Sequence, residues 1–289
     1  MRIFTLHFLI SFLLLSCIDR EKPVNKAKLK GDDYRLFQNT PAWELAKAVQ
    51  DENEDRIKGI LVKDPGLVNF QEPKFGHTLL QLTIRNQQLE SFKLLLANKA
   101  NIHIHDTYDG TSALIEACRY PWYDIRFAEI LVQNGANVND VEVGERRKGN
   151  STRFTPLMEA AKEGRLDMVK LFVSNGANID YQNEYKQSAL SQAVILEHYD
   201  VLLFLLQNGV DYKLPITYNE TQHKTYYLVD ELRFFMPDLG SKDHQLKKQV
   251  VDYLKTRGVD CNAVPISEFV KKKAQRLHPN NWQQYLEKY

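Results

Sequence analysis

The chain has 289 residues, and its 38 basic and 37 acidic residues give a formal net charge of +1. Such an even balance creates no global field that would draw the protein to nucleic acid or to an anionic lipid surface, so we expect no nucleic-acid partner. The length by itself allows one or two globular domains.

The first predicted element is an apolar segment at the N-terminus. Arg2 precedes an apolar run from Ile3 to Leu15, which stops at Ser16 and Cys17 before a strongly polar stretch. This pattern is typical of a secretory signal peptide, here residues 1–16. The run is shorter than the roughly 20 apolar residues of a membrane-spanning helix, so a transmembrane anchor is the weaker interpretation.

The segment Leu14-Leu15-Ser16-Cys17 resembles the lipobox of bacterial lipoproteins. The resemblance implies cleavage before Cys17, which would become the lipidated N-terminus; the alternative is an ordinary secretory peptide that contains a cysteine. In enterobacteria an aspartate at the next position retains lipoproteins in the inner membrane. Ile18 stands there instead, which implies an outer-membrane anchor facing the periplasm. Asp19 and Glu21 leave exposure on the cell surface open.

The polar residues 17–40 follow, with no helical pattern before Tyr34. We expect a flexible tether, which would span on the order of 25 to 30 Å and hold the rest of the protein clear of the lipid.

A short phrase then recurs at the end of apolar stretches with helical period. Complete copies are Asn134-Gly135-Ala136-Asn137 and Asn175-Gly176-Ala177-Asn178, with degraded copies at 98–101, 208–211 and 257–260. A second landmark precedes each phrase, complete as Thr155-Pro156-Leu157 and degraded at 78–80, 112–114 and 188–190. Leu114 lies 34 residues after Leu80, and Leu190 lies 33 residues after Leu157. One unit of nearly constant length is therefore repeated.

This pattern resembles the ankyrin repeat, which has a period of about 33 residues and the signature T-P-L-H-x-A. The resemblance implies an all-α fold, a solenoid of helix-turn-helix units joined by hairpin loops. An ordinary helical bundle is the alternative, but it does not explain why cap, small residues, amphipathic helix and glycine recur in one order. A solenoid grows by addition and needs no second core, so we expect one elongated domain.

Each landmark has a physical role. A Thr or Ser hydroxyl can cap the first free amides of a helix, and Pro156 suits the first helical position. The glycines at 135, 176, 209 and 258 would adopt the left-handed conformation just past the second helix. We place units at 41–75, 76–109, 110–150, 153–186 and 187–212, and a distorted sixth with helices over 226–235 and 245–256. Repeats thus cover 41–262, and residues 263–289 are predicted to cap the stack with helices over 267–277 and 279–289.

Three intervals depart from the regular spacing. Extra residues fall at Tyr120–Tyr123, where three aromatic side chains surround Pro121, and at Val141–Arg153, which carries the basic run 146–148. A third, tyrosine-rich insertion lies between Asp211 and Tyr227. Long loops inside compact repeats are often functional, although drift also produces insertions.

The family resemblance implies that partners bind at the hairpin tips and at the end of each first helix. Aromatic and charged residues, the types that dominate interface energies, occupy these positions. The predicted contact residues are Phe75, His77, Arg85, Tyr108, Asp109, Thr111, Arg119, Tyr120, Trp122, Tyr123, Arg153, Lys162, Glu163, Tyr185 and Lys186.

Little in the chain suggests catalysis. His103 and His105 with Asp106 are the best candidate for a metal site, but no third ligand stands at a suitable spacing. There is no H-E-x-x-H, G-x-S-x-G or phosphate-binding glycine loop, so we expect no enzyme activity, no metal and no cofactor. Cys118 and Cys261 belong to different repeats, too far apart for a disulfide, and should be free thiols.

We therefore expect a non-enzymatic, protein-binding lipoprotein of the bacterial envelope that is a monomer when free and touches the membrane only through its lipid. Ankyrin-repeat lipoproteins of this size occur as immunity proteins against secreted antibacterial effectors, such as phospholipases delivered by type VI secretion, and the resemblance implies this role. The alternative is an envelope scaffold or adaptor with no toxin partner.

Overall fold

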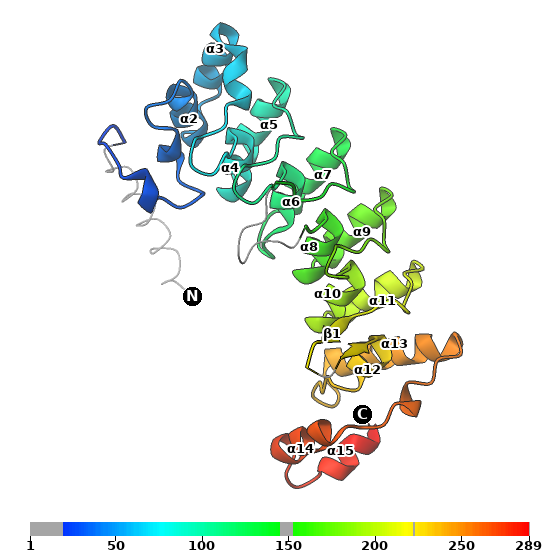
Figure 1. Cartoon of the computed structure of the whole chain (residues 1–289). Coiled ribbons are helices and arrows are strands. Elements are labelled where there is room, and N and C mark those ends of the chain that lie inside the picture. The colour runs from blue at the N-terminus through cyan, green and yellow to red at the C-terminus, as the bar shows by residue number, and fades with distance from the viewer. Residues whose placement is uncertain (1–19, 145–152, 222, 289) are drawn as a thin grey trace, which may run out of the picture. The chain divides into compact units, whose positions relative to one another are not determined.

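The computed structural model describes residues 20–144, 153–221 and 223–288. These residues form two compact units, divided between Tyr108 and Asp109, and each unit is described by itself (Figure 1). The predicted signal peptide 1–16, the predicted lipidation site Cys17 and the basic run 146–148 lie outside the described residues.

The first unit contains two helix pairs. The first pair is α2 (Trp43–Gln50) with α3 (Glu54–Lys63), and the second is α4 (Leu79–Arg85) with α5 (Leu89–Ala97). Helix α2 packs on α4 and α3 packs on α5, so the pairs stack like on like. Three short 3-10 helices accompany them, η1 (Lys26–Lys28), η2 (Tyr34–Phe37) and η3 (Pro65–Asn69).

The second unit continues the same arrangement. Its helix pairs are α6 (Ala113–Cys118) with α7 (Ile125–Gln133), α8 (Pro156–Lys162) with α9 (Leu166–Ser174), and α10 (Ala189–Ile195) with α11 (Tyr199–Gln207). Helix α12 (Leu228–Leu232), helix α13 (Lys242–Thr256), the 3-10 helix η4 (Cys261–Ala263), α14 (Glu268–Leu277) and α15 (Trp282–Lys288) follow. The expected all-α architecture of stacked helix pairs is confirmed.

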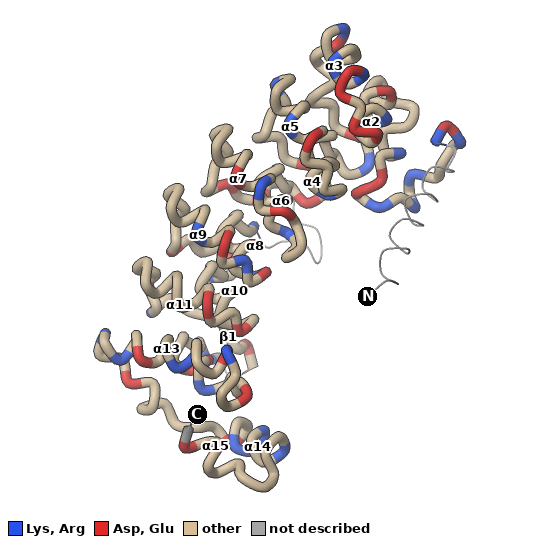
Figure 2. The backbone as a smooth tube through the Cα atoms, turned by 180° about the vertical axis from the view of Figure 1, so that it is seen from behind, with Lys and Arg blue, Asp and Glu red and all other residues tan. Residues whose placement is uncertain are grey.

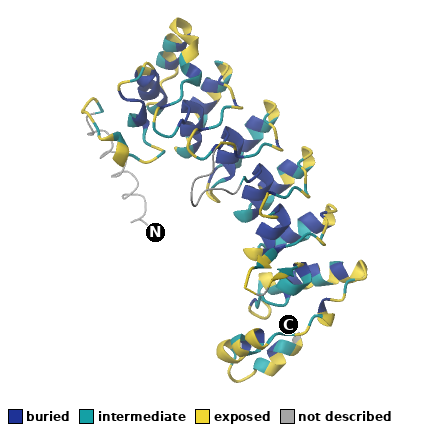
Figure 3. Ribbon diagram, in the orientation of Figure 1, coloured by how far each residue is buried: buried dark blue, intermediate teal, exposed yellow. Residues whose placement is uncertain are grey.

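Within each pair the two helices differ in burial. The first helices α4, α6, α8 and α10 are buried along nearly their whole length, whereas the second helices keep one side exposed (Figure 3). Small residues make the close packing possible, since Ala117, Ala160 and Ala193 are each fully buried on a first helix. The core is therefore a continuous layer of first helices in each unit.

The predicted helix starts are confirmed by their hydrogen bonds. The hydroxyls of Thr78, Ser112, Thr155 and Ser188 each accept the backbone N–H three residues further on. This bond satisfies one of the amides that a helix leaves free at its N-terminus, and its loss costs about 1 kcal/mol. Pro156 occupies the first turn of α8, where no N–H is needed.

The recurring Asn-Gly-Ala-Asn phrase is a complete helix-ending motif. Gly176 has φ +83°, its N–H donates to the Val173 carbonyl, and the Ala177 N–H donates to the Phe172 carbonyl. The same pair of bonds recurs at Gly135, Gly209 and Gly258, as well as at Lys99, which adopts φ +67° without being glycine. A Cβ at Gly176 would meet nothing within 4 Å, so the backbone conformation alone demands glycine there.

The last residue of the phrase has a role that the sequence did not reveal. Asn137 and Asn178 each accept the N–H of the residue two further on, which turns the chain into the next hairpin. Neighbouring repeats are also joined, because the Asn178 N–H donates to Asn139 at 2.7 Å and the Asp211 N–H donates to Asp180 at 2.8 Å. Polar bridges thus fix the register of the stack in the second unit.

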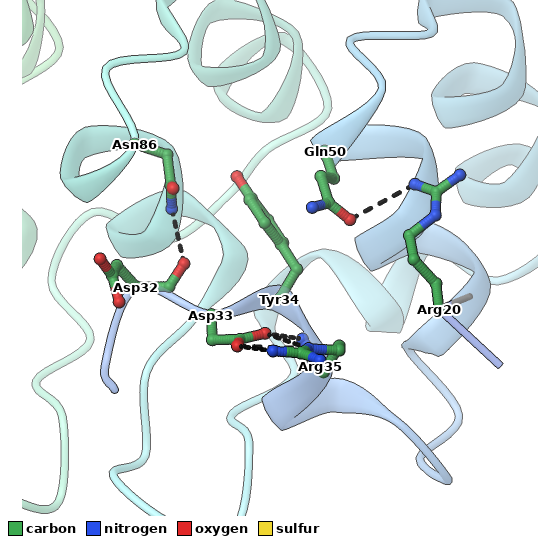
Figure 4. A pocket seen from close by; sticks show the side chains of 7 residues that line it. All are labelled: Arg20, Asp32, Asp33, Tyr34, Arg35, Gln50 and Asn86. Atoms are coloured by element: carbon green, nitrogen blue, oxygen red, sulfur yellow. Dashed lines mark hydrogen bonds and ion pairs between the residues drawn. The ribbon is translucent and has the colours of Figure 1, made fainter. Parts of the chain in front are cut away.

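The structure corrects the tether expected over 17–40 for its described part, residues 20–40. Residues 20–40 pack on the first unit, with Leu36 and Phe37 fully buried. The Gln38 amide donates to the carbonyls of Arg20 and Lys22. Figure 4 shows Arg20 bonded to Gln50 and the Asn86 amide bonded to the Asp32 carbonyl. The polar composition concealed that a few apolar residues of this segment complete the core.

Further bonds hold this segment at its start. Arg20 forms a paired contact with Asp51, at 2.6 and 3.1 Å, and Glu21 accepts from Lys47 and from the Trp43 indole. The Arg20 contact raises the pKa of the guanidinium and the Lys47 bond lowers that of Glu21. The N-terminal segment, residues 20–40, is therefore a cap on the first repeat.

The insertion after Asp211 contains a strand pair that we did not predict. Strands β1 (Thr217–Asn219) and β2 (Lys224–Tyr226) pair antiparallel, with Thr217 opposite Tyr226. Because β2 takes Tyr226, the helix expected over 226–235 is shorter and spans only Leu228–Leu232. The expected second helix of this unit is confirmed and begins slightly earlier, at Lys242.

The predicted pair of C-terminal helices is confirmed as α14 and α15. Tyr285 of α15 is buried, its ring stacks on His278 with 4.2 Å between centroids, and its hydroxyl donates to the Pro237 carbonyl at 2.9 Å. Cys118 and Cys261 are both free and buried. Among the described residues, no helix combines the length and the apolar character needed to cross a membrane.

Candidate functional site

The predicted contact residues divide between the two units. Phe75, His77, Arg85 and Tyr108 belong to the first, and all the others, from Asp109 onward, belong to the second. The two groups are considered separately.

In the first unit, the hairpin that carries Phe75 is organised around a buried carboxylate. Glu72 accepts the backbone N–H groups of Lys74, Phe75 and His77, at 2.7 to 3.2 Å. The Phe75 ring stacks on His77 and meets Tyr108 edge-on at 5.1 Å. His77 is only 4% exposed, so the expectation that it faces a partner is corrected: it supports the hairpin.

The chain's own N-terminal segment occupies part of this surface. A Cβ at Gly31 would lie 2.8 Å from the Arg85 guanidinium and 2.9 Å from the His77 ring. The Lys74 ammonium donates to the carbonyls of Ala27 and Leu29 at 3.0 and 2.8 Å. Residues 20–40 therefore cover the first-helix end of the second repeat, which leaves Tyr108 as the exposed aromatic of this group.

In the second unit, Arg119 at the end of α6 is the centre of an ion-pair network. Its guanidinium lies 3.0 Å from Asp109, 3.3 Å from Glu142 and 4.0 Å from Glu116, and it donates to the Thr111 hydroxyl at 2.7 Å. Burial opposes the charge, but the carboxylates of Glu116 and Asp109 outweigh it and raise the pKa of Arg119.

This network also shows that Thr111 cannot contact a partner. Thr111 is fully buried, and its hydroxyl serves as an acceptor for Arg119. Glu142 is bonded in turn, since it accepts the Phe154 N–H at 3.2 Å. The network therefore ties the end of α6 to the stretched hairpin after α7.

The aromatic turn, residues Tyr120–Tyr123, follows immediately. Tyr120 and Trp122 stack with 4.8 Å between centroids and an angle of 25°. They are 40% and 70% exposed, which is unusual for large apolar side chains. Tyr123 meets Tyr120 edge-on but is buried, so its expected exposure is corrected. Two of the three aromatic side chains thus face solvent and the third anchors the turn.

Arg165, which we did not predict, holds the aromatic turn from the next repeat. Its guanidinium donates to the carbonyls of Tyr120, Pro121 and Tyr123, at 3.4, 3.2 and 2.8 Å. Asp167 pairs with the same guanidinium at 2.9 Å. One planar side chain thereby joins the turn to Asp167, because Nη1 donates to the loop carbonyls while Nε and Nη2 donate to Asp167, a task suited to the fork of donors on arginine.

Beside the aromatic turn lies an open hollow of about 510 Å³ between the ends of α6 and α8. Its lining comprises Asp109, Arg119, Tyr120, Pro121, Trp122, Glu142, Glu159, Lys162 and Glu163. The Lys162 ammonium lies between Glu159, at 3.0 Å, and Glu163, at 3.3 Å. Burial raises the pKa of Glu159, and Lys162 partly offsets that shift. Figure 2 places basic and acidic residues close together along α6 and α8.

The remaining predicted residues lie beside the hairpins. Arg153 donates to the carbonyls of Glu142 and Gly144, so it braces its own hairpin. Tyr185 and Lys186 are exposed at the tip of the next hairpin. The residues that sequence reasoning missed are Glu142, Glu159 and Arg165. Their signal was weak, since nothing in the repeat spacing tells which charged residue turns inward.

Within 20–144, 153–221 and 223–288, no three His, Cys, Asp or Glu side chains are grouped as a metal site would require. Cys118 is fully buried, and burial raises the pKa of its thiol, which makes it a poor nucleophile.

Comparison with known proteins agrees with the repeat pattern. A family model described as ankyrin repeats in three copies matches residues 45–142 and 140–215. The chain is 27% identical over 207 residues to the ankyrin repeat and KH domain-containing protein mask-1 of Caenorhabditis elegans, which covers 64% of this chain and 8% of that protein. It is 28% identical over 134 residues to an ankyrin repeat protein of Rickettsia bellii, which covers 44% of this chain and 36% of that protein.

An ankyrin repeat protein of Acanthamoeba polyphaga mimivirus is 25% identical over 166 residues, which covers 57% of this chain and 20% of the viral protein. In each comparison the chain spans well under half the length of the relative. The likeness therefore concerns the repeats.

Proposed function

This chain belongs to the ankyrin-repeat family, which provides modules for protein–protein interaction, and from that premise we propose that it binds a protein partner through the aromatic turn and the adjoining hollow of its second unit. The observation that carries this proposal is the exposed Tyr120–Trp122 stack, which Arg165 holds in place.

Exposed aromatic pairs are costly on the surface of a soluble protein and are characteristic of interface centres. A fixed turn loses little conformational entropy when it is covered, so its apolar area contributes more fully to binding. The equivalent first-helix end in the second repeat is covered by residues 20–40. The second unit therefore offers the better partner surface among the described residues.

The test of this proposal is partner binding by matched variants of the full chain. The partner is captured with the wild-type chain as bait. Trp122→Ala should weaken binding to this captured partner at least tenfold, whereas Phe269→Ala, which truncates a similarly exposed aromatic on α14, should leave it within about twofold. Circular dichroism establishes that both variants are folded. Equal affinities for all three proteins would show that the partner uses another surface.

We further propose that the protein is an envelope lipoprotein that neutralises a secreted antibacterial effector. The support is the lipobox-like Leu14-Leu15-Ser16-Cys17 segment together with the protein-binding fold. Inhibition would be steric, with the second unit covering the active site of the effector. An effector encoded beside this protein, such as a phospholipase, is the first candidate.

Two measurements test this version. Cys17→Ala should abolish fatty-acid labelling and release the protein from the membrane; labelling that persists would contradict lipidation. Cells lacking the protein should be damaged only when neighbouring cells deliver the effector. A defect in shape or permeability without attackers would favour the envelope scaffold instead.

A further inference from the structure

The hollow beside the aromatic turn carries more negative than positive charge. Its lining contains the four carboxylates of Asp109, Glu142, Glu159 and Glu163 but the cations of Arg119 and Lys162 only. A further carboxylate, Glu116, lies 4.0 Å from Arg119 beneath it. Both cations are already held, each between two carboxylates of the lining. The same ion pairs engage all four lining carboxylates, so the preference for an incoming cation comes from the excess of four carboxylates over two cations.

The apolar wall of the same hollow is the stacked Tyr120–Trp122 pair. An aromatic face attracts a cation, with Trp the strongest, and the attraction grows when water is excluded. Trp122 is the more exposed ring of the pair, and it lines the same hollow as Asp109 and Glu163. The Trp122 ring and the carboxylates of the lining thus both favour a cationic group.

We propose that this hollow accepts an arginine or lysine side chain of the protein partner, with the alkyl stem on the Trp122 ring and the cationic end above the carboxylates. The proposal rests on the proposed function of protein binding and adds the chemistry of the recognised group. A guanidinium suits the site best, because it stacks on an aromatic ring and donates to carboxylates at the same time.

The local field is measured first, without any partner. Caesium and iodide ions both quench tryptophan fluorescence, but they carry opposite charges. The quenching of Trp122 is obtained by subtracting the fluorescence of Trp122→Phe from that of the wild-type chain. The ratio of caesium to iodide quenching constants, divided by the same ratio for N-acetyltryptophanamide, should be about two, because a negative field attracts caesium and repels iodide. This ratio should fall in Glu163→Gln. A ratio below one would overturn the proposal.

The second measurement uses hexa-arginine and hexa-glutamate amides as probes of the full chain. Hexa-arginine should bind, and Trp122→Ala and Glu163→Gln should each weaken it at least about fivefold, while hexa-glutamate should not bind. The matched controls are Phe269→Ala and Asp252→Asn, which remove an exposed ring and an exposed carboxylate elsewhere. Equal loss in the controls would mean binding by general charge alone and would overturn the proposal.

The two proposals fail separately. Trp122→Ala could weaken binding of the captured partner while Glu163→Gln changes neither the ion quenching nor hexa-arginine binding. In that case the proposed protein binding stands and the proposed cation recognition is wrong. If Trp122→Ala does not change the affinity for the partner, the proposed function itself is wrong.

Discussion

Arg165 links two repeats by a residue-scale contact on which the candidate site depends. Its Nη1 donates to three carbonyls of the aromatic turn while its Nε and Nη2 donate to Asp167. A lysine ammonium is a compact charge without a planar fork, so it cannot hold both groups in this geometry. The exposed stack therefore owes its fixed position to one side chain outside the turn.

Arg165→Lys should loosen the aromatic turn selectively. Loss of these bonds is expected to cost about 1–3 kcal/mol locally, because carbonyls at the turn lose their donors. Amide hydrogen exchange should quicken over residues 120–126 and stay unchanged in α10 and α11. Arg126→Ala, which removes an exposed arginine that pairs with Asp124, is the control and should leave the turn intact.

Lys247 makes the stability of the sixth repeat depend on pH. Burial, aided by the nearby charge of Arg233, lowers its pKa from 10.5 to about 7. Between these two values the unfolded chain holds a proton that the folded chain does not, so stability rises with pH through that window. Below about pH 7 both states are protonated and the stabilisation is lost.

The expected gain between pH 7 and pH 9 is about 2 kcal/mol, measured as the difference in unfolding free energy between wild type and Lys247→Met. Met retains the apolar stem without a titrating group. A difference that does not change with pH would mean that the ammonium reaches solvent.

At the scale of elements, the helix-ending motif is governed by backbone conformation. Gly176→Ala should destabilise the protein by about 1–2 kcal/mol, since φ is +83° and no neighbour would contact the new methyl group. Lys99→Gly should instead stabilise the protein, because Lys99 holds the same left-handed conformation at φ +67°, where glycine is favoured. Unfolding in urea measures both.

Gly59→Ala is the control for chain entropy. This glycine lies in α3, where a Cβ also meets nothing within 4 Å, so alanine should stabilise by about 0.5–1 kcal/mol. If alanine had the same sign at positions 59 and 176, conformation would not be the cause.

The N-terminal segment, residues 20–40, behaves as an element of the first unit. Leu36→Ala should destabilise it by about 2–5 kcal/mol, because a fully buried side chain leaves a cavity. Lys28→Ala, in the same segment but exposed, should change stability by less than about 0.5 kcal/mol. A negligible effect of Leu36→Ala would restore the flexible tether.

At the scale of the whole molecule, periodic signals were sufficient to predict the fold. The Thr-Pro-Leu and Asn-Gly-Ala-Asn landmarks specify helix starts and ends through local bonds, and these are properties of a few consecutive residues. The repeats and their spacing followed from them, and the two C-terminal helices over 267–277 and 279–289 were predicted separately from the polar tail. Exposure at Tyr120 and Trp122 was also predicted, since their insertion breaks the spacing.

Long-range contacts decided the rest. Several features depend on contacts between segments that are separated along the chain. They are the burial of His77, Thr111 and Tyr123, the inward orientation of Glu142 and Glu159, the hydrogen bonds of Arg165 and the packing of residues 20–40. A charged side chain has the same local pattern whether it faces water or a partner charge, because its environment is set by which repeat stacks on it. The sequence by itself thus determined the helices, their order and their ends, whereas only the tertiary structure decided which polar residues form the site, since ion pairs and desolvation depend on neighbours brought together by stacking.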